Sequence, residues 1–153
     1  MTNPVFLFVV RHAPPVKSGL CYGQSDIPVH PAAEEAALRV VRQLPHHIDV
    51  VYCSPSARTR MLALALSNLT GIEYCVDARL AEVNFGQWEG REWNEIHGTE
   101  PDALTFWAES PMLRAPPRGE TGQALVERVL EFVGEQELDH ALLVCHAGPI
   151  RAL

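Results

Sequence analysis

The stretch VFLFVVRH, residues 5–12, decides the fold, because six apolar residues, Val5–Val10, run directly into Arg11 and His12. A short continuous run of β-branched and aromatic residues is typical of a strand that is buried on both faces of a parallel sheet. Three further segments have this character: Ile48–Cys53, Ala141–Cys145 and, more weakly, Ile72–Val76. We expect these segments to be strands of one sheet.

Helical patterns separate the expected strands. They cover three segments: Pro31–Leu44, Ser54 to about Leu69, and Thr121 to about Gly134. Pro31 suits the first position of its helix, and Ser54 suits the N-cap of the second helix. Strands that alternate with helices build a mostly parallel sheet with both faces covered. The sequence therefore predicts an α/β protein with three layers, α/β/α.

A single domain is expected to span residues 1–153, because this length suits one domain and leaves no room for two. Residues 77–120 interrupt the alternation of strands and helices, and they contain all three tryptophans and several prolines. Such an excursion in an α/β domain is often a lid or a substrate-binding region. We expect it to carry short helices and to contact the substrate.

Charge and composition argue against some functions. Twelve Lys and Arg against nineteen Asp and Glu give a net charge of −7, whereas binding to nucleic acid or to an anionic membrane needs a basic face. A small anionic substrate and a homo-oligomer both remain compatible with the sequence. No apolar run approaches the ~18 residues of a membrane span, and the run at residues 5–10 is too short for a signal peptide. The four cysteines form no C-x-x-C pair, so we expect reduced thiols in the cytoplasm.

Polar residues that can bind an anion follow three of the expected strands. Arg11 and His12 follow the first, Arg58 lies shortly after the second, and His146 follows the last. Because ligands of open α/β sheets bind beyond the carboxyl ends of the strands, these side chains are expected at one edge. A lone histidine at a strand end is usually structural, and a lone arginine on a first helical turn is usually solvated. The pattern alone leaves an anion site and structural roles both open.

Six segments resemble the signature segments of the histidine phosphatase superfamily, also called phosphoglycerate mutase-like, and occur in the family's order. They are VVRHAPP (9–15), CYGQSDIPV (21–29), CSPSARTR (53–60), LAEVNFGQWEG (80–90), RGETGQALVERV (118–129) and VCHAGPIRAL (144–153). The resemblance spans the whole chain. It implies the phosphoglycerate mutase-like fold and a metal-independent phosphomonoesterase without a cofactor, whose partner is a small phosphorylated metabolite.

The resemblance also implies roles for four residues. His12 would attack phosphorus and become a phosphohistidine, for which its ring must be neutral. Arg11 and Arg58 would hold the phosphoryl oxygens, because a guanidinium binds phosphate in bidentate fashion and stays charged. His146 would bind the transferring phosphoryl group and stabilise its charge.

Glu82 would be the general acid for the leaving oxygen and later the base for water. That role requires a carboxyl group that is protonated at first, which partial burial beside Phe85 and Trp88 would favour. Without the motif, Glu82 would be interpreted as an ordinary surface residue. Glu89, the competing carboxylate, follows the tryptophan of the motif and is structural in the family pattern.

Two further expectations concern the phosphate pocket. The backbone around Tyr22 and Gly23 is expected to add phosphate contacts, although Tyr22 suits a core position equally well. Arg60 competes with Arg58, but the two differ by about 200° around a helix, so only one can face the site. The register of the motif and the first-turn position both select Arg58.

No metal site is expected. His46 and His47 lie between a helix and a strand, and we find no acidic or thiol companion for them at ligand spacing. They are interpreted as a solvated turn.

Within the superfamily, the segment GLCYGQSDIPV and the small size most resemble the α-ribazole-5′-phosphate phosphatases of cobalamin synthesis. Two alternatives stay open. A phosphoglycerate mutase would have a longer excursion than the 64 positions that separate Glu82 from His146. A non-catalytic phosphate-binding module would ordinarily have lost His12 or Glu82.

The C-terminal segment is short, since only seven residues follow His146. Pro149 is expected at the first position of a helix of one turn, which has little intrinsic stability. We therefore expect the chain to lack the family's C-terminal elements, so that the loop of His146 loses packing support.

Overall fold

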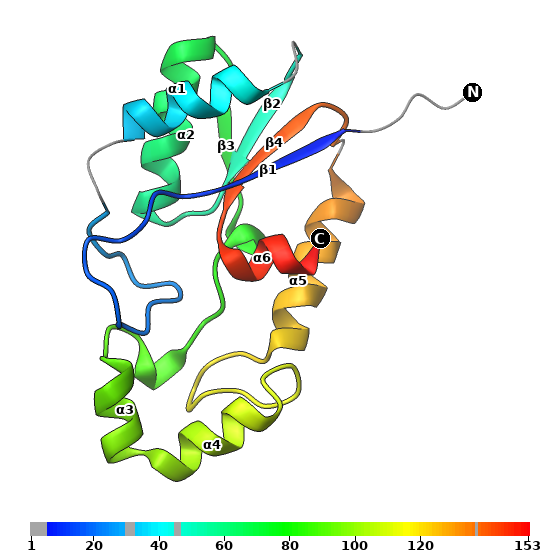
Figure 1. Ribbon diagram of the computed structural model, residues 1–153. Helices are drawn as coiled ribbons and strands as arrows, with labels where there is room; N and C mark the ends of the chain where they lie inside the picture. The colour runs from blue at the N-terminus through cyan, green and yellow to red at the C-terminus, as the bar shows by residue number, and fades with distance from the viewer. Residues whose placement is uncertain (1–5, 30–32, 45–46, 137) are drawn as a thin grey trace.

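Four parallel strands form the sheet of the protein, whose computed structural model describes residues 6–29, 33–44, 47–136 and 138–153 (Figure 1). They are β1 (Leu7–Arg11), β2 (Val50–Cys53), β3 (Tyr74–Val76) and β4 (Ala141–Cys145), in the spatial order β1-β4-β2-β3. The expected parallel sheet is thus confirmed. Val5 and Pro31, which the sequence places at the starts of elements, lie outside the described residues.

β4 lies in the middle of the sheet. Its first residue, Ala141, pairs with Leu7 of β1 on one side and with Val50 of β2 on the other. All five residues of β4 are buried. A strand that is covered on both faces has no solvent side, which explains why this segment is an unbroken apolar run.

Two layers of helices cover the sheet, which confirms the three-layer α/β/α fold. α1 (Ala33–Gln43) and α2 (Ala57–Thr70) lie on one face, and α5 (Gly122–Glu135) and α6 (Ala147–Ala152) on the other (Figure 1). On the first face, Leu62 and Leu66 of α2 pack with Val51 and Leu142. On the second face, the core forms around Phe132 of α5.

Helix α2 begins at Ala57, three residues later than Ser54, and Ser54 does not cap it. The carboxylate of Asp26 accepts the N–H of Ala57 at 2.7 Å instead, so a residue of a distant loop satisfies this helix end. Helix α5 begins where the sequence predicts it. The hydroxyl of Thr121 accepts the N–H of Ala124 at 3.1 Å as an N-cap.

The last helix, α6, begins two residues earlier than expected. His146 is its N-cap and Ala147 its first residue, so that Pro149 occupies the third position. Proline is tolerated in the first turn because the N–H groups there have no acceptor within the helix. The N-terminus of α6 therefore follows His146 directly and presents the N–H of Gly148 near it.

Residues 77–120 carry short helices, as expected. These are two 3₁₀ turns and two α-helices: η1 (Ala78–Leu80), η2 (Gly86–Trp88), α3 (Trp93–Thr99) and α4 (Pro101–Glu109). The rings of Phe85, Trp88, Trp93 and Trp107 pack together with centroids 5.6–6.4 Å apart. This aromatic cluster gives the excursion a small core of its own, beyond one edge of the sheet in Figure 1.

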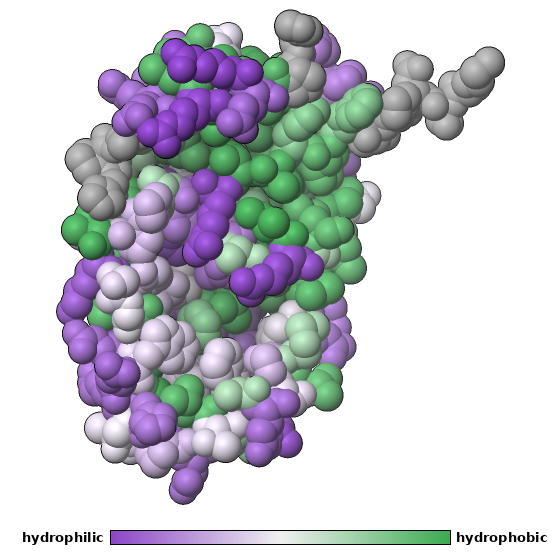
Figure 2. All heavy atoms as spheres, viewed as in Figure 1, coloured by the Kyte–Doolittle hydropathy of each residue, from purple (hydrophilic) through white to green (hydrophobic). Residues whose placement is uncertain are grey.

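Figure 2 shows hydrophilic residues over α1 and hydrophobic residues gathered toward the β1 side of the sheet. Phe6 and Val9 are 48% and 41% exposed there. Across the described ranges, no helix has both the length and the apolar character needed to cross a membrane.

Candidate active site

Three of the four polar side chains expected at the carboxyl edge of the sheet meet there. His12 follows β1, Arg58 lies in the first turn of α2 after β2, and His146 follows β4. The ring centroids of His12 and His146 are 5.0 Å apart, and Nε of Arg58 lies 3.3 Å from Nε2 of His12. All three are buried, with exposed fractions of 7%, 2% and 0%. Two imidazoles and a guanidinium thus form one desolvated, electropositive pocket.

Hydrogen bonds fix the tautomer of His12. Its Nδ1 lies 2.6 Å from the carbonyl oxygen of Ala13, which can only accept a hydrogen bond. Its Nε2 receives the Nε–H of Arg58. The neutral ring therefore carries its hydrogen on Nδ1 and a lone pair on Nε2. Burial lowers the pKa of His12 to about 4, opposed by the bond to Ala13 and assisted by the charges of Arg58 and Arg11.

Arg58 is held by the loop that precedes α1. Its Nη1 donates to the carbonyl oxygen of Ser25 at 2.8 Å, and its Nη2 donates to the carbonyl oxygen of Gly23. Burial lowers the pKa of Arg58, against the charges of nearby carboxylates that include Glu82, but a guanidinium remains charged at physiological pH. Arg60 is exposed. The register of the motif thus selected the arginine that faces the two histidines.

Arg11 ends β1, and its side chain is exposed. Its charge nevertheless contributes to the lowered pKa of both His12 and His146. Arg11 is therefore within electrostatic reach of both histidines.

The expected phosphate contact at Gly23 needs correction. Its N–H donates to the carboxylate of Glu89 at 3.1 Å, and its carbonyl oxygen accepts from Arg58, so both backbone groups are engaged within the protein. A Cβ at this position would lie 1.8 Å from the carbonyl oxygen of Val83, which only glycine allows. Gly23 therefore positions Arg58. The hydroxyl of Tyr22 donates to the carbonyl oxygen of Lys17 at 3.1 Å.

Glu89 is structural, as the family pattern implies. Its carboxylate accepts the N–H groups of Gly23, Gln24, Ser25 and Phe85 at 2.9–3.1 Å, and the hydroxyl of Ser25 as well. Burial alone would raise the pKa of Glu89, but these hydrogen bonds outweigh it and hold the pKa below its usual value. One carboxylate thus ties the loop that holds Arg58 to the segment that carries Glu82.

His146 has one engaged and one unpartnered ring nitrogen. Its Nε2 lies 2.7 Å from Oγ of Ser54, whose hydroxyl also accepts the N–H of Ser56 and lies 3.4 Å from the hydroxyl of Ser56. Among the described residues, Nδ1 of His146 is the only buried side-chain nitrogen or oxygen without a hydrogen-bond partner. Burial, followed by the charges of Arg58 and His12, lowers the pKa of His146 to about 2. Where the Ser54 hydroxyl donates to Nε2, the neutral ring carries its hydrogen on Nδ1.

Glu82 is half-buried and lies at the N-terminus of α6. Its Oε1 accepts the N–H of Val83 at 2.9 Å and the N–H of Gly148 at 3.1 Å, and Oε2 is 3.2 Å from the same Gly148 nitrogen. A Cβ on Gly148 would come within 2.1 Å of Oε1. The glycine of this segment is thus needed for the close approach of the carboxyl group.

The surroundings of Glu82 differ in part from the expectation. Phe85 lines the same cavity as Glu82. Trp88 instead belongs to the aromatic cluster of the excursion, and its indole N–H donates to Glu100 at 3.0 Å. Trp88 therefore supports the excursion, and it has no part in the burial of Glu82.

Arg128 of α5 is a positioning residue that the sequence interpretation missed. Its Nη1 donates to the carbonyl oxygens of Arg79 and Ala81 at 2.6 and 2.8 Å, and its Nη2 donates to that of Glu82 at 3.1 Å. The Glu120 carboxylate pairs with it at 2.7 Å. The sequence contains a signal for this role. Arg128 follows the inward-facing Leu125 by three positions, so it lies near the buried face of the helix.

The expectation that His47 lacks an acidic companion was wrong. Its Nε2 lies 2.9 Å from Oδ1 of Asp49. His46 lies outside the described residues.

Comparison with known proteins identifies the family. A sequence model of the histidine phosphatase superfamily (branch 1) matches residues 7–153. The chain belongs to the histidine phosphatase superfamily. Phosphoserine phosphatase 1 of Hydrogenobacter thermophilus is 29% identical over 158 residues, which cover 97% of this chain and 74% of that protein.

Two solved structures of related phosphatases share the fold. The α-ribazole phosphatase of Shigella flexneri matches with a TM-score of 0.84 and 24% identity, over 94% of this chain and 75% of that one. A mycobacterial glucosyl-3-phosphoglycerate phosphatase, solved with inorganic phosphate, matches with a TM-score of 0.76 and 29% identity, over 96% and 75%. The expected phosphoglycerate mutase-like fold and the class of phosphoric monoester hydrolase are confirmed for this histidine phosphatase.

The two pocket histidines predict a loss of stability in mild acid. Their pKa values are about 4 and about 2 in the folded protein, against about 6.5 in an unfolded chain. Below pH 6.5 the unfolded state therefore binds more protons, and the free energy of unfolding falls by up to about 1.4 kcal/mol per pH unit for each histidine. Above pH 6.5 both histidines are neutral in the folded and the unfolded state, so they no longer lower the free energy of unfolding. Urea unfolding at pH 7.5, 6, 5 and 4.5 measures the slope.

The control for this prediction is the double variant His12→Asn, His146→Asn, which replaces both titrating rings by neutral amides. Its free energy of unfolding should change much less between pH 7.5 and 4.5. An equal slope in the two proteins would show that other groups cause the pH dependence.

Proposed function

We propose that this chain is a metal-independent phosphomonoesterase that acts through a phosphohistidine at Nε2 of His12. The observation that carries the proposal is the bonding of that ring, with a hydrogen on Nδ1 and a lone pair on Nε2 facing Arg58. A neutral imidazole in a desolvated pocket is an activated nucleophile. Beside it, the charges of Arg58 and Arg11 suit the oxygens of a phosphoryl group.

The first half of the reaction transfers the phosphoryl group to the enzyme. The Nε–H of Arg58 turns from Nε2 of His12 to a phosphoryl oxygen, and the freed lone pair forms a bond to phosphorus while the bond from phosphorus to the leaving oxygen breaks. Glu82 gives its proton to that oxygen, so that an alcohol leaves. Because Oε1 accepts the N–H groups of both Val83 and Gly148 whereas Oε2 has only the longer contact to Gly148, the proton is assigned to Oε2.

The second half restores the enzyme. The Glu82 carboxylate takes a proton from a water molecule, whose oxygen attacks phosphorus as the bond to Nε2 of His12 breaks. Inorganic phosphate leaves and Glu82 is protonated again. Throughout, Arg11, Arg58 and the Nδ1–H of His146 stabilise the charge on the equatorial oxygens. The unpartnered Nδ1 of His146 supports this last role.

The preferred substrate is proposed to be α-ribazole 5′-phosphate, in cobalamin synthesis and in the cytoplasm. A cavity of about 470 Å³ adjoins Glu82, and most of the residues that line it are apolar, among them Phe85, Trp107, Met112 and Leu125. Such walls suit a leaving group that carries an aromatic base better than one as small and charged as serine. The 25% identity over 155 residues to the adenosylcobalamin/α-ribazole phosphatase of Escherichia coli agrees with this choice. Four free cysteines, three of them buried, suit a reducing compartment.

The experiment that tests the chemistry compares the wild type with Glu82→Gln in the presence of EDTA. The wild type should hydrolyse p-nitrophenyl phosphate and alkyl phosphates. The variant should lose about 10²–10⁴-fold on alkyl phosphates, whose leaving oxygen needs a proton, and much less on the nitrophenyl ester. Equal losses for both esters would assign the general acid to another residue.

A panel of phosphorylated metabolites then decides the substrate. α-Ribazole 5′-phosphate should give a kcat/KM at least tenfold above those of phosphoserine and glucosyl-3-phosphoglycerate. Isomerisation of 3-phosphoglycerate without release of phosphate would identify a mutase. Tight binding of phosphate with no turnover of any ester would identify a non-catalytic module.

A further inference from the structure

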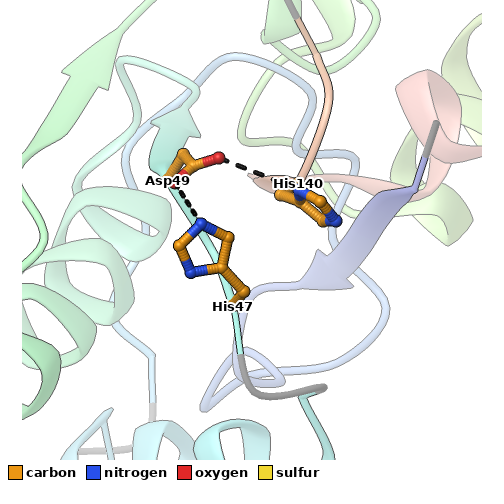
Figure 3. Close-up of side chains that lie close together, drawn as sticks. All are labelled: His47, Asp49 and His140. Atoms are coloured by element: carbon orange, nitrogen blue, oxygen red, sulfur yellow. Dashed lines mark ion pairs between the residues drawn. The ribbon is translucent and has the colours of Figure 1, made fainter. Parts of the chain in front are cut away.

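Three side chains that commonly ligate metals meet at the amino-terminal edge of the sheet, away from the catalytic pocket. They are His47, Asp49 and His140 (Figure 3). Asp49 directly precedes β2 and His140 directly precedes β4, whereas His12 and His146 follow the other ends of the strands. The five residues of β4 place about 16 Å between the two edges. The phosphatase chemistry does not use this cluster.

The spacing of the three side chains suits a single metal ion. Nε2 of His47 lies 2.9 Å from Oδ1 of Asp49, and Nδ1 of His140 lies 3.8 Å from Oδ2 of the same carboxylate. One ligand atom from each residue lies within 4.8 Å of the others. A tetrahedral ion with bonds of 2.0–2.2 Å separates its donors by about 3.4 Å. Figure 3 shows both imidazoles directed at the Asp49 carboxylate, so the three donors gather around one point.

The backbone holds two of these residues on a rigid support. The N–H of Asp49 donates to the carbonyl oxygen of His140 at 3.0 Å, and the next residues, Val50 and Ala141, pair in the sheet. His140 has φ of +55°, a left-handed conformation that is uncommon for residues other than glycine. The start of β4 is thus turned so that the imidazole of His140 lies next to Asp49.

We propose that His47, Asp49 and His140 form a binding site for a divalent transition metal ion such as Zn²⁺, separate from catalysis. Two imidazoles and one carboxylate are donors that such ions favour. The side chains are 70%, 54% and 33% exposed, so the ion reaches them from solvent and water completes its coordination. Asp139, 3.6 Å from Nδ1 of His140, adds a second negative charge. The bound ion clamps the start of β2 to the start of β4.

Zinc binding to metal-free protein tests the proposal, with calorimetry for stoichiometry and Co²⁺ absorption for geometry. One Zn²⁺ should bind per chain and raise the Tm by about 5–10 °C at a hundredfold excess over Kd. Asp49→Asn and His140→Asn should each weaken binding at least tenfold and abolish the Tm shift. Asparagine tolerates the left-handed conformation of position 140 and keeps the fold intact. Turnover of p-nitrophenyl phosphate should stay unchanged in both variants.

Two control variants locate the bound ion. His97→Gln removes an exposed histidine of α3 and should leave zinc binding unchanged. His12→Ala removes a ligand from the catalytic pocket and should also leave it unchanged. Absence of a Tm shift in the wild type, binding that survives both Asp49→Asn and His140→Asn, or binding lost in His12→Ala alone would each overturn the proposal. None of these outcomes tests the phosphatase function, which is measured separately as the activity of the wild-type protein in EDTA.

Discussion

Replacing His12 with alanine will lower kcat for p-nitrophenyl phosphate by about 10⁵-fold, because the reaction loses the atom that attacks phosphorus. The remaining groups of the pocket, Arg58 and His146, still bind phosphate, so KM should change far less than kcat. Steady-state kinetics on purified protein measures both constants. In wild-type protein, rapid quenching with ³²P-labelled substrate should trap an acid-labile, base-stable phosphate that the variant lacks.

The matched control is His97→Ala, which removes an exposed imidazole and should retain wild-type turnover. Circular dichroism and the Tm show whether His12→Ala is folded. A phosphohistidine label that persists in folded His12→Ala protein would place the nucleophile at another residue.

Replacing Arg58 with lysine is expected to lower kcat/KM by about 10³-fold although the positive charge is kept. Three bonds from the guanidinium reach His12, Gly23 and Ser25 at once. A lysine ammonium is a point charge without the planar fork, so it cannot make these bonds and grip two phosphoryl oxygens as well. The measurements are kcat/KM, which should fall, and the inhibition constant of vanadate, which should rise by a similar factor.

Arg60→Lys provides the control within the same helix, since Arg60 is exposed and lies about 200° around the helix from Arg58. Its kcat/KM should stay within about twofold of wild type, as for most exposed substitutions. A loss of similar size in both variants would mean that the net charge of α2, and not the geometry of Arg58, determines activity.

The sequence was sufficient for the parts of this protein that depend on local pattern. The unbroken apolar run of Ala141–Cys145 predicted a strand covered on both faces, and β4 is buried at all five residues. The position of polar residues after strands predicted that His12, Arg58 and His146 would meet. The rule works because carboxyl ends of parallel strands lie along one edge of a sheet.

Long-range partners could not be derived in this way. Asp26 caps a helix that begins 31 positions later, and the N–H of Gly23 is taken by a carboxylate 66 positions away. Any of several polar residues satisfies the local preference for a cap, and only the folded loop decides which one is near. The neighbourhood of Asp49 and His140 likewise depends on the pairing of β2 with β4.

The place of β4 in the sheet has a consequence for synthesis on the ribosome. In the described part of the chain, β1 pairs with β4 alone, and Leu7 is opposite Ala141, 134 positions later. At a translation rate of about 5–20 residues per second, the apolar β1 segment stays unpaired for about 7–27 s until β4 has been synthesised. His12, the proposed nucleophile, directly follows that strand, so the pocket assembles only after β4 and His146 have been translated. Nascent chains that lack β4 are thus expected to be inactive, and during this interval they expose a strand edge that can aggregate or bind a chaperone.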